Sequence, residues 1–373
     1  MSAQPLRYGL IGAGMMGREH IRNLGLIPGS ELVAIADPSA EQVALSIAEA
    51  GRHLGQSPRG HATPEAMLAA DPLDCVVIAS PNDTHIAVLE TVLRHRPGLG
   101  ILVEKPVVTR LADCGRLEAM ATGHPRPIWV AMEYRYMPPV AELRRAVSAG
   151  EIGTLRMFAI REHRFPFLEK VGDWNRFSER TGGTLVEKCC HFFDLMRLVV
   201  GSEPVRVYAS GAADVNHRDE RYDGRVPDIL DNAFVIVDFA NGCRASLDLC
   251  MFAEGSWFQE EIAATGDAAK IEVFIPGPAR FWPGGAERDS EVVVSPRVPK
   301  GPVRRKVHVD EAILKAGDHH GSTYFQHLGF RAAMLENGPV DVTLADGLQA
   351  VRIGLAAEES ARTGQSIRLD AFG

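Results

Sequence analysis

The sequence predicts an α/β protein with two domains: a parallel, doubly wound sheet comes first, and an α/β domain with a large, mostly antiparallel open sheet follows. At 373 residues the chain is too long for one typical hydrophobic core. In its first third, short apolar runs alternate with helical patterns, which is typical of parallel strands joined by right-handed crossovers. After Tyr134 the apolar runs lengthen and are joined by hairpin-like loops such as residues 240–243. We therefore predict domains at 1–133 and 134–373.

The opening segment indicates a nucleotide-binding strand, turn and helix. Residues 6–11 are a largely apolar run that leads directly into the G-x-G-x-x-G sequence Gly12-Ala13-Gly14-Met15-Met16-Gly17. In such a motif Gly12 permits the tight turn, Gly14 lets the backbone approach a pyrophosphate, and Gly17 lets the helix pack closely on the strand. The helix N-terminus then favours the anion. A chance glycine turn is the alternative, but the full strand–turn–helix context favours a Rossmann site.

Asp37 ends a second apolar run, residues 31–36, about twenty residues after the last glycine of the motif. A carboxylate at this place is expected to receive the ribose hydroxyls. Its charge would repel a 2′-phosphate, and Pro38-Ser39 offer no cation to hold one, so we expect NAD rather than NADP as the cofactor. The alternative role for Asp37 is that of a turn residue or a cap for the next helix.

Further strands of the first domain are predicted at 74–79, 101–103 and 127–131, with a helix at 84–96. Ligands of a parallel sheet bind at the carboxyl ends of its strands. The glycine turn, Asp37, Ser80-Pro81-Asn82 and Lys105 all fall at such ends, and their common placement predicts one binding edge.

The second domain is predicted from longer strand-like runs and two helices. The runs are residues 155–160, 205–210, 234–239, 244–251 and 259–264. Residues 181–201 are expected to form one helix with a large apolar side, and residues 344–363 a final helix. Residues 278–303 are rich in proline, glycine and arginine, so we expect an exposed loop there.

The composition and charge exclude several classes of protein. A formal net charge of −8 argues against nucleic acid or an anionic membrane as the partner of the bulk surface. The first residues lack a signal-peptide pattern, and no apolar stretch is long enough to span a bilayer. Six cysteines in a chain of this length do not suggest a disulfide framework. We therefore expect a cytoplasmic protein.

The motifs together resemble the glucose–fructose oxidoreductase/inositol dehydrogenase (Gfo/Idh/MocA) family. The matching pieces are Gly12 to Gly17 with Asp37, Ala79-Ser80-Pro81-Asn82-Asp83-Thr84-His85, Glu104-Lys105-Pro106, Tyr134-Arg135-Tyr136, and 182–194. The resemblance spans nearly the whole chain. It implies NAD-dependent oxidation or reduction of a sugar, a polyol or a related carbon skeleton, and a dimer or tetramer formed through the open sheet.

The motifs, the resemblance and the residue chemistry around them together predict two ligand-binding sets. The cofactor set comprises Gly12, Gly14, Met15, Met16, Gly17, Asp37, Ser80, Pro81, Asn82, His85, Glu104 and Lys105. The substrate set comprises Lys105, Tyr134, Arg135, Arg161, His163, Arg164, Trp174, Glu187, His191, His320 and Tyr324. The chain departs from the family at Glu187, where many members carry aspartate, and at the unusual pair Cys189-Cys190.

Three residues are predicted to perform the catalysis. His191 is the first candidate for general base, because the pKa of imidazole lies near working pH. Glu187 lies four residues earlier on the predicted helix and would share its face, where it would hold His191 or bind a substrate hydroxyl. Lys105 would bind or polarise the reacting oxygen. The alternatives are a packed or helix-surface histidine and a lysine that is paired with Glu104 at the surface.

Two further groups of residues, and Trp174 between them, also have candidate roles. Arg161, His163 and Arg164, with Lys170 and Arg176, predict either recognition of an anionic substrate group or a solvated or subunit-contact surface. Trp174 would stack on a sugar ring or pack in the core. Asp318-His319-His320 places adjacent histidines on different sides of a helix, so we expect no metal site.

We therefore expect an NAD-dependent dehydrogenase that acts on a secondary hydroxyl of a sugar or cyclic polyol. The first alternative is a glycoside-cleaving enzyme that oxidises, eliminates, hydrates and re-reduces its substrate. The second is a non-enzymatic NAD or sugar sensor.

Overall fold

The computed structural model describes residues 5–298 and 301–372, and its chain divides into two compact units. The first unit contains the residues up to Glu133 together with 170–174 and 311–351, and the second contains 134–169, 175–310 and the residues from Arg352 onward. The predicted domains, 1–133 and 134–373, remain a sequence-based division of the chain. Each unit is described by itself below.

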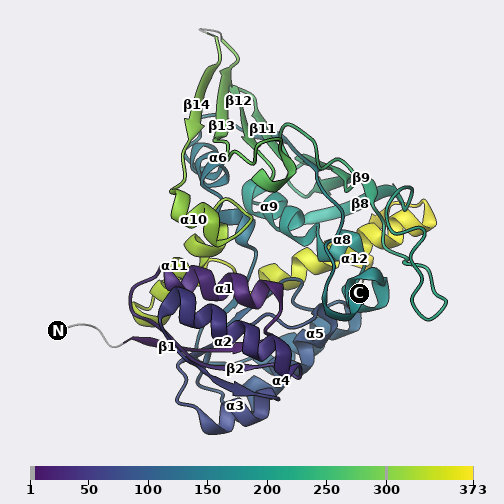
Figure 1. Ribbon diagram of the computed structural model, residues 1–373. Helices are drawn as coiled ribbons and strands as arrows, with labels where there is room; N and C mark the ends of the chain where they lie inside the picture. The colour runs from purple at the N-terminus through teal and green to yellow at the C-terminus, as the bar shows by residue number, and fades with distance from the viewer. Residues whose placement is uncertain (1–4, 299–300, 373) are drawn as a thin grey trace. The chain divides into compact units, whose positions relative to one another are not determined.

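The first unit is built on a six-stranded parallel sheet in the order β3-β2-β1-β4-β5-β6 (Figure 1). Its strands are β1 (Leu6–Ile11), β2 (Ser30–Ala36), β3 (Arg59–His61), β4 (Cys75–Ile78), β5 (Gly100–Val103) and β6 (Ile128–Val130). Its main helices are α1 (Met15–Gly25), α2 (Ala40–Leu54), α3 (Pro64–Ala70), α4 (His85–His95), α5 (Leu111–Ala121), α10 (Glu311–Ala316) and α11 (Ser322–Leu335). This is the parallel, doubly wound sheet that the sequence predicted.

The strands of this sheet are almost wholly apolar because helices cover both faces of a parallel sheet. Every residue of β4 and β5 is buried. The strand order reverses at β1, whose neighbours are β2 and β4. A ligand of such a sheet lies outside the carboxyl ends of the strands at this point.

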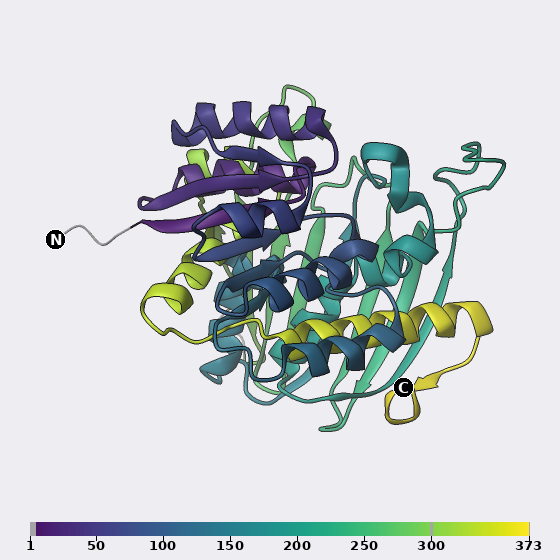
Figure 2. The ribbon, with the colours of Figure 1, turned by 90° about the horizontal axis from the view of Figure 1, so that it is seen from below.

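The second unit contains a nine-stranded mixed sheet in the order β14-β13-β12-β11-β7-β10-β9-β8-β15, whose strands run side by side in Figure 2. They are β7 (Leu155–His163), β8 (Pro204–Ala212), β9 (Asn232–Phe239), β10 (Arg244–Cys250), β11 (Glu260–Gly266), β12 (Ala269–Ile275), β13 (Ser290–Pro296), β14 (Val303–Val307) and β15 (Ile367–Arg368). The pair β7–β10 is parallel and the other pairs are antiparallel. The predicted hairpin turn at 240–243 joins β9 to β10, with Gly242 at a φ of 82°.

One face of this sheet is buried and the other is exposed. Phe158, Ile160, Val235 and Val237 belong to the buried face, over which α9 (Cys190–Val200) and α6 (Pro138–Ser148) pack against β7 and β12. The alternating residues are exposed, among them Met157, Tyr208, Phe234 and Ile236. The cross-strand register places these four side chains on the same face.

Two expectations about the elements need correction. Residues 278–303 are not simply a loop: β13 pairs with β12, because 290–296 supplies three consecutive valines that fit a pleated surface. The predicted helix at 181–201 is divided into the end of α7 (Ser178–Thr181), α8 (Thr184–Glu187) and α9. The final helix is confirmed as α12 (Leu344–Thr363). Among the described residues, none of the helices combines the length and apolar character needed to cross a bilayer.

Candidate functional site

The glycine-rich turn lies between β1 and α1 in the first unit. Gly12 has a φ of 99°, and a Cβ there would lie 2.5 Å from the backbone of Ala79 and Ser80. A Cβ on Gly17 would overlap the carbonyl oxygen of Gly12. At Gly14, by contrast, a Cβ would meet nothing within 4 Å. Two glycines therefore let the chain pack on itself, and the third borders open space where a pyrophosphate would fit.

The N-terminus of α1 is suited to an anion. Gly14 is its N-cap, no side chain caps it, and its first turn contains no acidic residue. Met15 and Met16 are its first two residues, and Met15 is exposed. Their backbone N–H groups and the helix dipole would hold a phosphate.

Asp37 follows β2 and contacts the glycine-rich turn. Its Oδ2 accepts a hydrogen bond from the N–H of Ala13 at 2.8 Å, and its Oδ1 accepts one from the N–H of Ser39 at 2.8 Å. A carboxylate has about four acceptor sites, so two remain for ribose hydroxyls. The expected cofactor role and the alternative turn role are therefore compatible.

The loop after β4 carries Ser80, Pro81, Asn82 and His85. The buried ring of His85 has its nitrogens 2.8 Å from the carbonyl oxygen of Pro106 and 2.9 Å from that of Ser80, so it joins the loops that follow β4 and β5. Burial lowers the pKa of His85, and the two carbonyl contacts oppose this effect only in part. Within the described residues, the side-chain nitrogen of Asn82 is buried without a hydrogen-bond partner, as expected for a group that binds a ligand.

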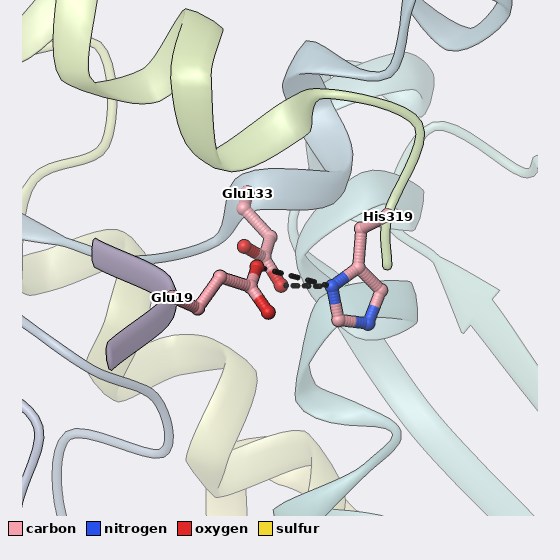
Figure 3. A group of neighbouring side chains, drawn as sticks. All are labelled: Glu19, Glu133 and His319. Atoms are coloured by element: carbon pink, nitrogen blue, oxygen red, sulfur yellow. Dashed lines mark ion pairs between the residues drawn. The ribbon is translucent and has the colours of Figure 1, made fainter. Parts of the chain in front are cut away.

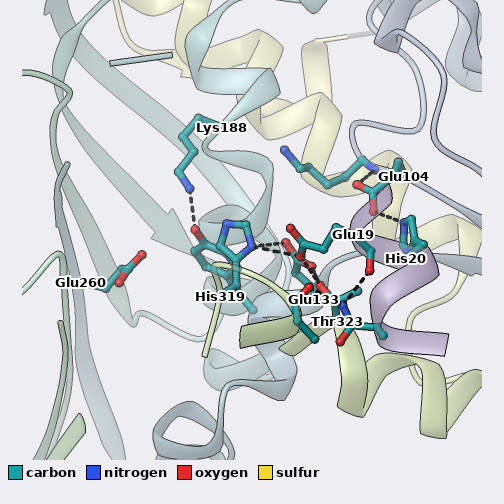
Figure 4. Close-up of polar contacts among 12 residues, drawn as sticks. Glu19, His20, Glu104, Glu133, Lys188, Glu260, His319 and Thr323 are labelled. Atoms are coloured by element: carbon teal, nitrogen blue, oxygen red, sulfur yellow. Dashed lines mark hydrogen bonds and ion pairs between the residues drawn. The ribbon is translucent and has the colours of Figure 1, made fainter. Parts of the chain in front are cut away.

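Glu104 and Lys105 follow β5. The Glu104 carboxylate lies 3.0 Å from Nε2 of His20 and accepts a hydrogen bond from the N–H of Lys105 at 3.3 Å (Figure 4). Burial raises the pKa of Glu104, but its hydrogen bond to His20 and the nearby charges outweigh this effect, and the net pKa is lowered. Nδ1 of His20 in turn lies 2.9 Å from Nε2 of His327. Glu104 thus anchors the backbone from which the half-buried Lys105 extends.

In the second unit, His191 lies in the first turn of α9 and is 2% exposed. Its ring stacks on that of Tyr134, with centroids 4.2 Å apart and an interplanar angle of 9°. The expectation that Glu187 and His191 share one face of a continuous helix is wrong. The chain leaves α8 after Glu187, and Cys189, with ψ near −5°, turns it into α9. Both side chains are nevertheless buried in this segment.

Lys188 was not predicted from the sequence. It is 3% exposed, its Nζ donates to the hydroxyl of Tyr134 at 2.5 Å, and the same Nζ forms an ion pair with Glu162 at 2.9 Å. Glu260 on β11 lies directly opposite Glu162 on β7 in the register of the two strands. A lysine inside the mostly apolar segment 184–196, which also contains Glu187 and Asp194, was the available signal, since a buried lysine requires a specific partner.

Arg135 is held by the protein itself. Its Nε donates to Oδ2 of Asp194 at 2.6 Å and its second nitrogen to Oδ1, a buried bidentate pair. This contact fixes the segment after β6 to α9. The contact of Arg135 with a substrate stays a prediction.

The predicted cationic cluster is divided by the two-residue period of β7. Arg161 and His163 lie on the exposed face, where both pair with Asp248 at 3.5 and 3.1 Å. The buried face carries Glu162, and Arg164 lies 3.6 Å from it. The structure therefore does not bring Arg161 and His163 together with His191, because alternate residues of a strand face opposite ways.

The remaining predicted substrate residues lie in the first unit. Trp174 has the Nζ of Lys170 5.8 Å from its ring. His320 is buried at a φ of 50°, and Tyr324 packs edge-on against Phe325 in α11. Their contact with a substrate stays a prediction.

Comparison with known proteins identifies the family to which both parts of the chain are similar. The Gfo/Idh/MocA description "Oxidoreductase family, NAD-binding Rossmann fold" matches residues 6–132, and "Oxidoreductase family, C-terminal alpha/beta domain" matches 144–369. The chain is 24% identical to myo-inositol 2-dehydrogenase of Thermotoga maritima, over 98% of this chain and 99% of that one. It is 25% identical to scyllo-inositol 2-dehydrogenase (NAD(+)) of Bacillus subtilis, over 98% and 96%.

Solved structures show the same fold. A putative myo-inositol dehydrogenase from Sinorhizobium meliloti superposes with a TM-score of 0.75 at 24% identity, covering 98% of this chain and 99% of the other. An oxidoreductase from Agrobacterium radiobacter, solved with NAD+, L-tartaric acid and magnesium, superposes with a TM-score of 0.78 at 19% identity, covering 99% of each chain.

Proposed function

Because the chain belongs to the Gfo/Idh/MocA oxidoreductase family, we propose that it is an NAD-dependent dehydrogenase that acts on a secondary hydroxyl of a sugar or cyclic polyol. The observation that carries this proposal is the turn at Gly12, Gly14 and Gly17, beside Asp37 and the uncapped N-terminus of α1. This arrangement suits a dinucleotide with a free ribose 2′-hydroxyl. The relatives named for inositol dehydrogenase activity support a polyol as the substrate class.

The chemistry divides between the cofactor and the chain. Bound NAD would supply the hydride acceptor. His191 would take the hydroxyl proton, and its stacking on Tyr134 fixes the ring plane for that transfer. Lys105 would donate a hydrogen bond to the reacting oxygen, whose negative charge grows as the proton leaves. Glu187 would bind a neighbouring substrate hydroxyl.

A combined assay tests the reaction class and the cofactor. The purified protein is incubated with NAD or NADP and a panel of inositols, aldoses, uronic acids and nitrophenyl glycosides. NADH formation with a free sugar or polyol, faster than NADPH formation, is the expected result. Nitrophenol release that requires NAD but accumulates no NADH would overturn the net dehydrogenase and indicate cleavage by transient oxidation.

The role of His191 is tested by substitution. We expect His191→Ala to lower kcat by about 10²–10⁴-fold while the Kd for NAD stays within about twofold, because a general base acts on the substrate proton. Steady-state rates and NAD titration by fluorescence measure the two effects. An equal loss of turnover and of NAD affinity would contradict the assignment, since it would indicate a disturbed fold.

A further inference from the structure

Three side chains in the first unit place metal-ligand atoms together at a position that the proposed reaction does not use. They are Glu19 on α1, Glu133 three residues after the end of β6, and His319 between α10 and α11. One ligand atom from each residue lies within 4.8 Å of the others. Nδ1 of His319 is 3.2 Å from Oε1 of Glu133 and 4.0 Å from Oε1 of Glu19, so the imidazole nitrogen faces both carboxylates (Figure 3).

The two carboxylates are buried, and the nearby charges of Arg22 on Glu19 and of Lys105 and His20 on Glu133 only partly offset the effect of burial and of the neighbouring carboxylates on their pKa values. Glu19 is 5% exposed and Glu133 is 1% exposed. Among the described residues, their side-chain contacts are with His319 and Thr323, neither of which is a lysine or an arginine. Two ionised carboxylates at such separation repel each other strongly away from water. A cation or a proton must therefore compensate the pair.

The contacts of Thr323 add to the need for a compensating proton or cation. Its Oγ1 lies 2.9 Å from Oε1 of Glu19 and 2.7 Å from Oε2 of Glu133 (Figure 4). A hydroxyl has one hydrogen, so it can donate to only one of these carboxylates. With both carboxylates ionised, the second contact places two oxygens together with no hydrogen between them, so the arrangement needs either a protonated carboxyl or a cation that draws one carboxylate away from the hydroxyl. Burial and then the charge of Glu133 raise the pKa of Glu19 to about 8, and burial and then Glu104 raise that of Glu133 to about 7.

We propose that Glu19, Glu133 and His319 bind one divalent cation, with an oxygen of each carboxylate and Nδ1 of His319 as its ligands. Imidazole with two carboxylates suits Zn²⁺ or Mn²⁺ better than Ca²⁺ or Mg²⁺, which take oxygen ligands. Ligands at about 2.0–2.2 Å from a metal lie roughly 3.0–3.6 Å from each other. The 3.2 Å separation already meets this range, and the 4.0 Å separation requires the side chains to close by less than about 1 Å.

The surroundings provide what such a site needs. Two carboxylates neutralise a divalent charge. The Thr323 hydroxyl can orient one of them, the supporting role that outer groups take around protein metals. The ligands come from α1, from the end of the parallel sheet and from the segment before α11. A cation would therefore join sequence-distant parts of the first unit and stabilise it.

Metal content and thermal stability test the proposal without any measurement of activity. The protein is purified without chelator and its metal is counted by mass spectrometry. It is then stripped with EDTA and melted at pH 8 with and without ZnCl₂ or MnCl₂. We expect about one bound equivalent and a rise in Tm of at least about 3 °C when the metal is returned.

Variants separate a cation site from a shared proton. Glu133→Gln keeps the size of the side chain but removes the charge of one ligand, so the metal-dependent rise in Tm should vanish. The metal-free variant should have a Tm no lower than that of the metal-free wild type. His319→Ala should also abolish the metal-dependent rise in Tm, and it provides a second test in case Glu133→Gln does not fold. Glu49→Gln is the matched control: it removes a buried glutamate paired with Arg22 and Arg52, and the rise should persist. A wild type without metal and without a Tm response would overturn the proposal, as would an unchanged rise in Glu133→Gln.

Discussion

At the scale of single residues, the three glycines of the first turn have different physical tasks. Gly17 is required by the protein, because a Cβ there would overlap the Gly12 carbonyl oxygen. Gly14 is not required by the protein, because a Cβ there would meet only open space. Its backbone conformation is extended, which any residue adopts. We therefore infer that any requirement for glycine at 14 would come from a ligand.

This difference predicts opposite effects of the same substitution. Gly17→Ala should destabilise the fold by about 1–3 kcal/mol, because the helix must move away from the turn. Gly14→Ala should leave the stability within about 0.5 kcal/mol but weaken NAD binding at least tenfold, because the methyl group occupies the pyrophosphate position. Urea unfolding and NAD titration measure the two quantities. Unchanged NAD affinity in Gly14→Ala would contradict the location of the pyrophosphate.

The sequence could predict these residues as cofactor-binding because such a prediction depends on local spacing. The glycine turn, Asp37 and Lys105 each follow a strand, and strand ends can be located from apolar runs. Lys188 and the Glu19–Glu133–His319 group could not be found in this way. Their partners, Tyr134 and Glu162 in one case and three separate segments in the other, are brought together only by tertiary packing.

At the scale of elements, the pair of strands β7 and β11 contains an unusual contact. Glu162 and Glu260 are directly opposite each other and both are buried. Lys188 forms an ion pair with Glu162, and Gln259 donates a hydrogen bond to Glu260 at 2.6 Å. Burial, followed by the charge of Glu162, raises the pKa of Glu260 to about 8. Glu260 is therefore held protonated at neutral pH.

The raised pKa predicts how stability changes with pH. Between about pH 4.5 and 8 the folded chain holds a proton on Glu260 that the unfolded chain releases, so this group's contribution to stability is full below pH 4.5 and decreases as pH rises through 8. Glu260→Gln should remove this contribution. The free energy of unfolding of the variant relative to wild type should therefore rise by about 2 kcal/mol or more from pH 5 to pH 8.5.

Urea denaturation at the two pH values checks this result. Glu261→Gln, on the same strand but facing the other way, is the control and should leave the wild-type pH dependence unchanged. A parallel offset of wild type and Glu260→Gln at both pH values would show that Glu260 does not titrate in this range.

The break between α8 and α9 shows where prediction by periodicity fails. Apolar residues recur at helical spacing through 184–200, which predicts a single helix. The chain nevertheless turns at Lys188 and Cys189, where Lys188 is directed to Glu162 and Tyr134. The stability gained from this buried ion pair and hydrogen bond depends on Glu162 of β7. Because β7 is distant in sequence, no local pattern predicts the break between α8 and α9.

At the scale of the whole molecule, the two types of sheet were predictable from strands with two-residue alternation or continuous apolar runs, but β3 and β12 to β15 were not predicted. The assignment of residues 311–351 to the first unit was not predictable, because it depends on contacts of α10 and α11 with α1, which lies almost 300 residues earlier in the sequence. The exposed sheet face is a further whole-molecule property. Met157, Tyr208, Phe234 and Ile236 occupy one face of adjacent strands, where a monomer would expose apolar surface to water.

We predict that this face forms a subunit interface, as the family resemblance implied. Phe234 and Ile236 are 66% and 51% exposed, and a glutamate in place of either would put an uncompensated charge into an apolar contact. Phe234→Glu together with Ile236→Glu should convert a dimer or tetramer into a smaller species with an unchanged far-ultraviolet spectrum, as measured by light scattering after size exclusion. Leu45→Glu, at an apolar residue on α2 that is 45% exposed, should leave the mass unchanged. A wild-type chain that is monomeric at micromolar concentration would refute the interface, and the exposed face would then need another partner.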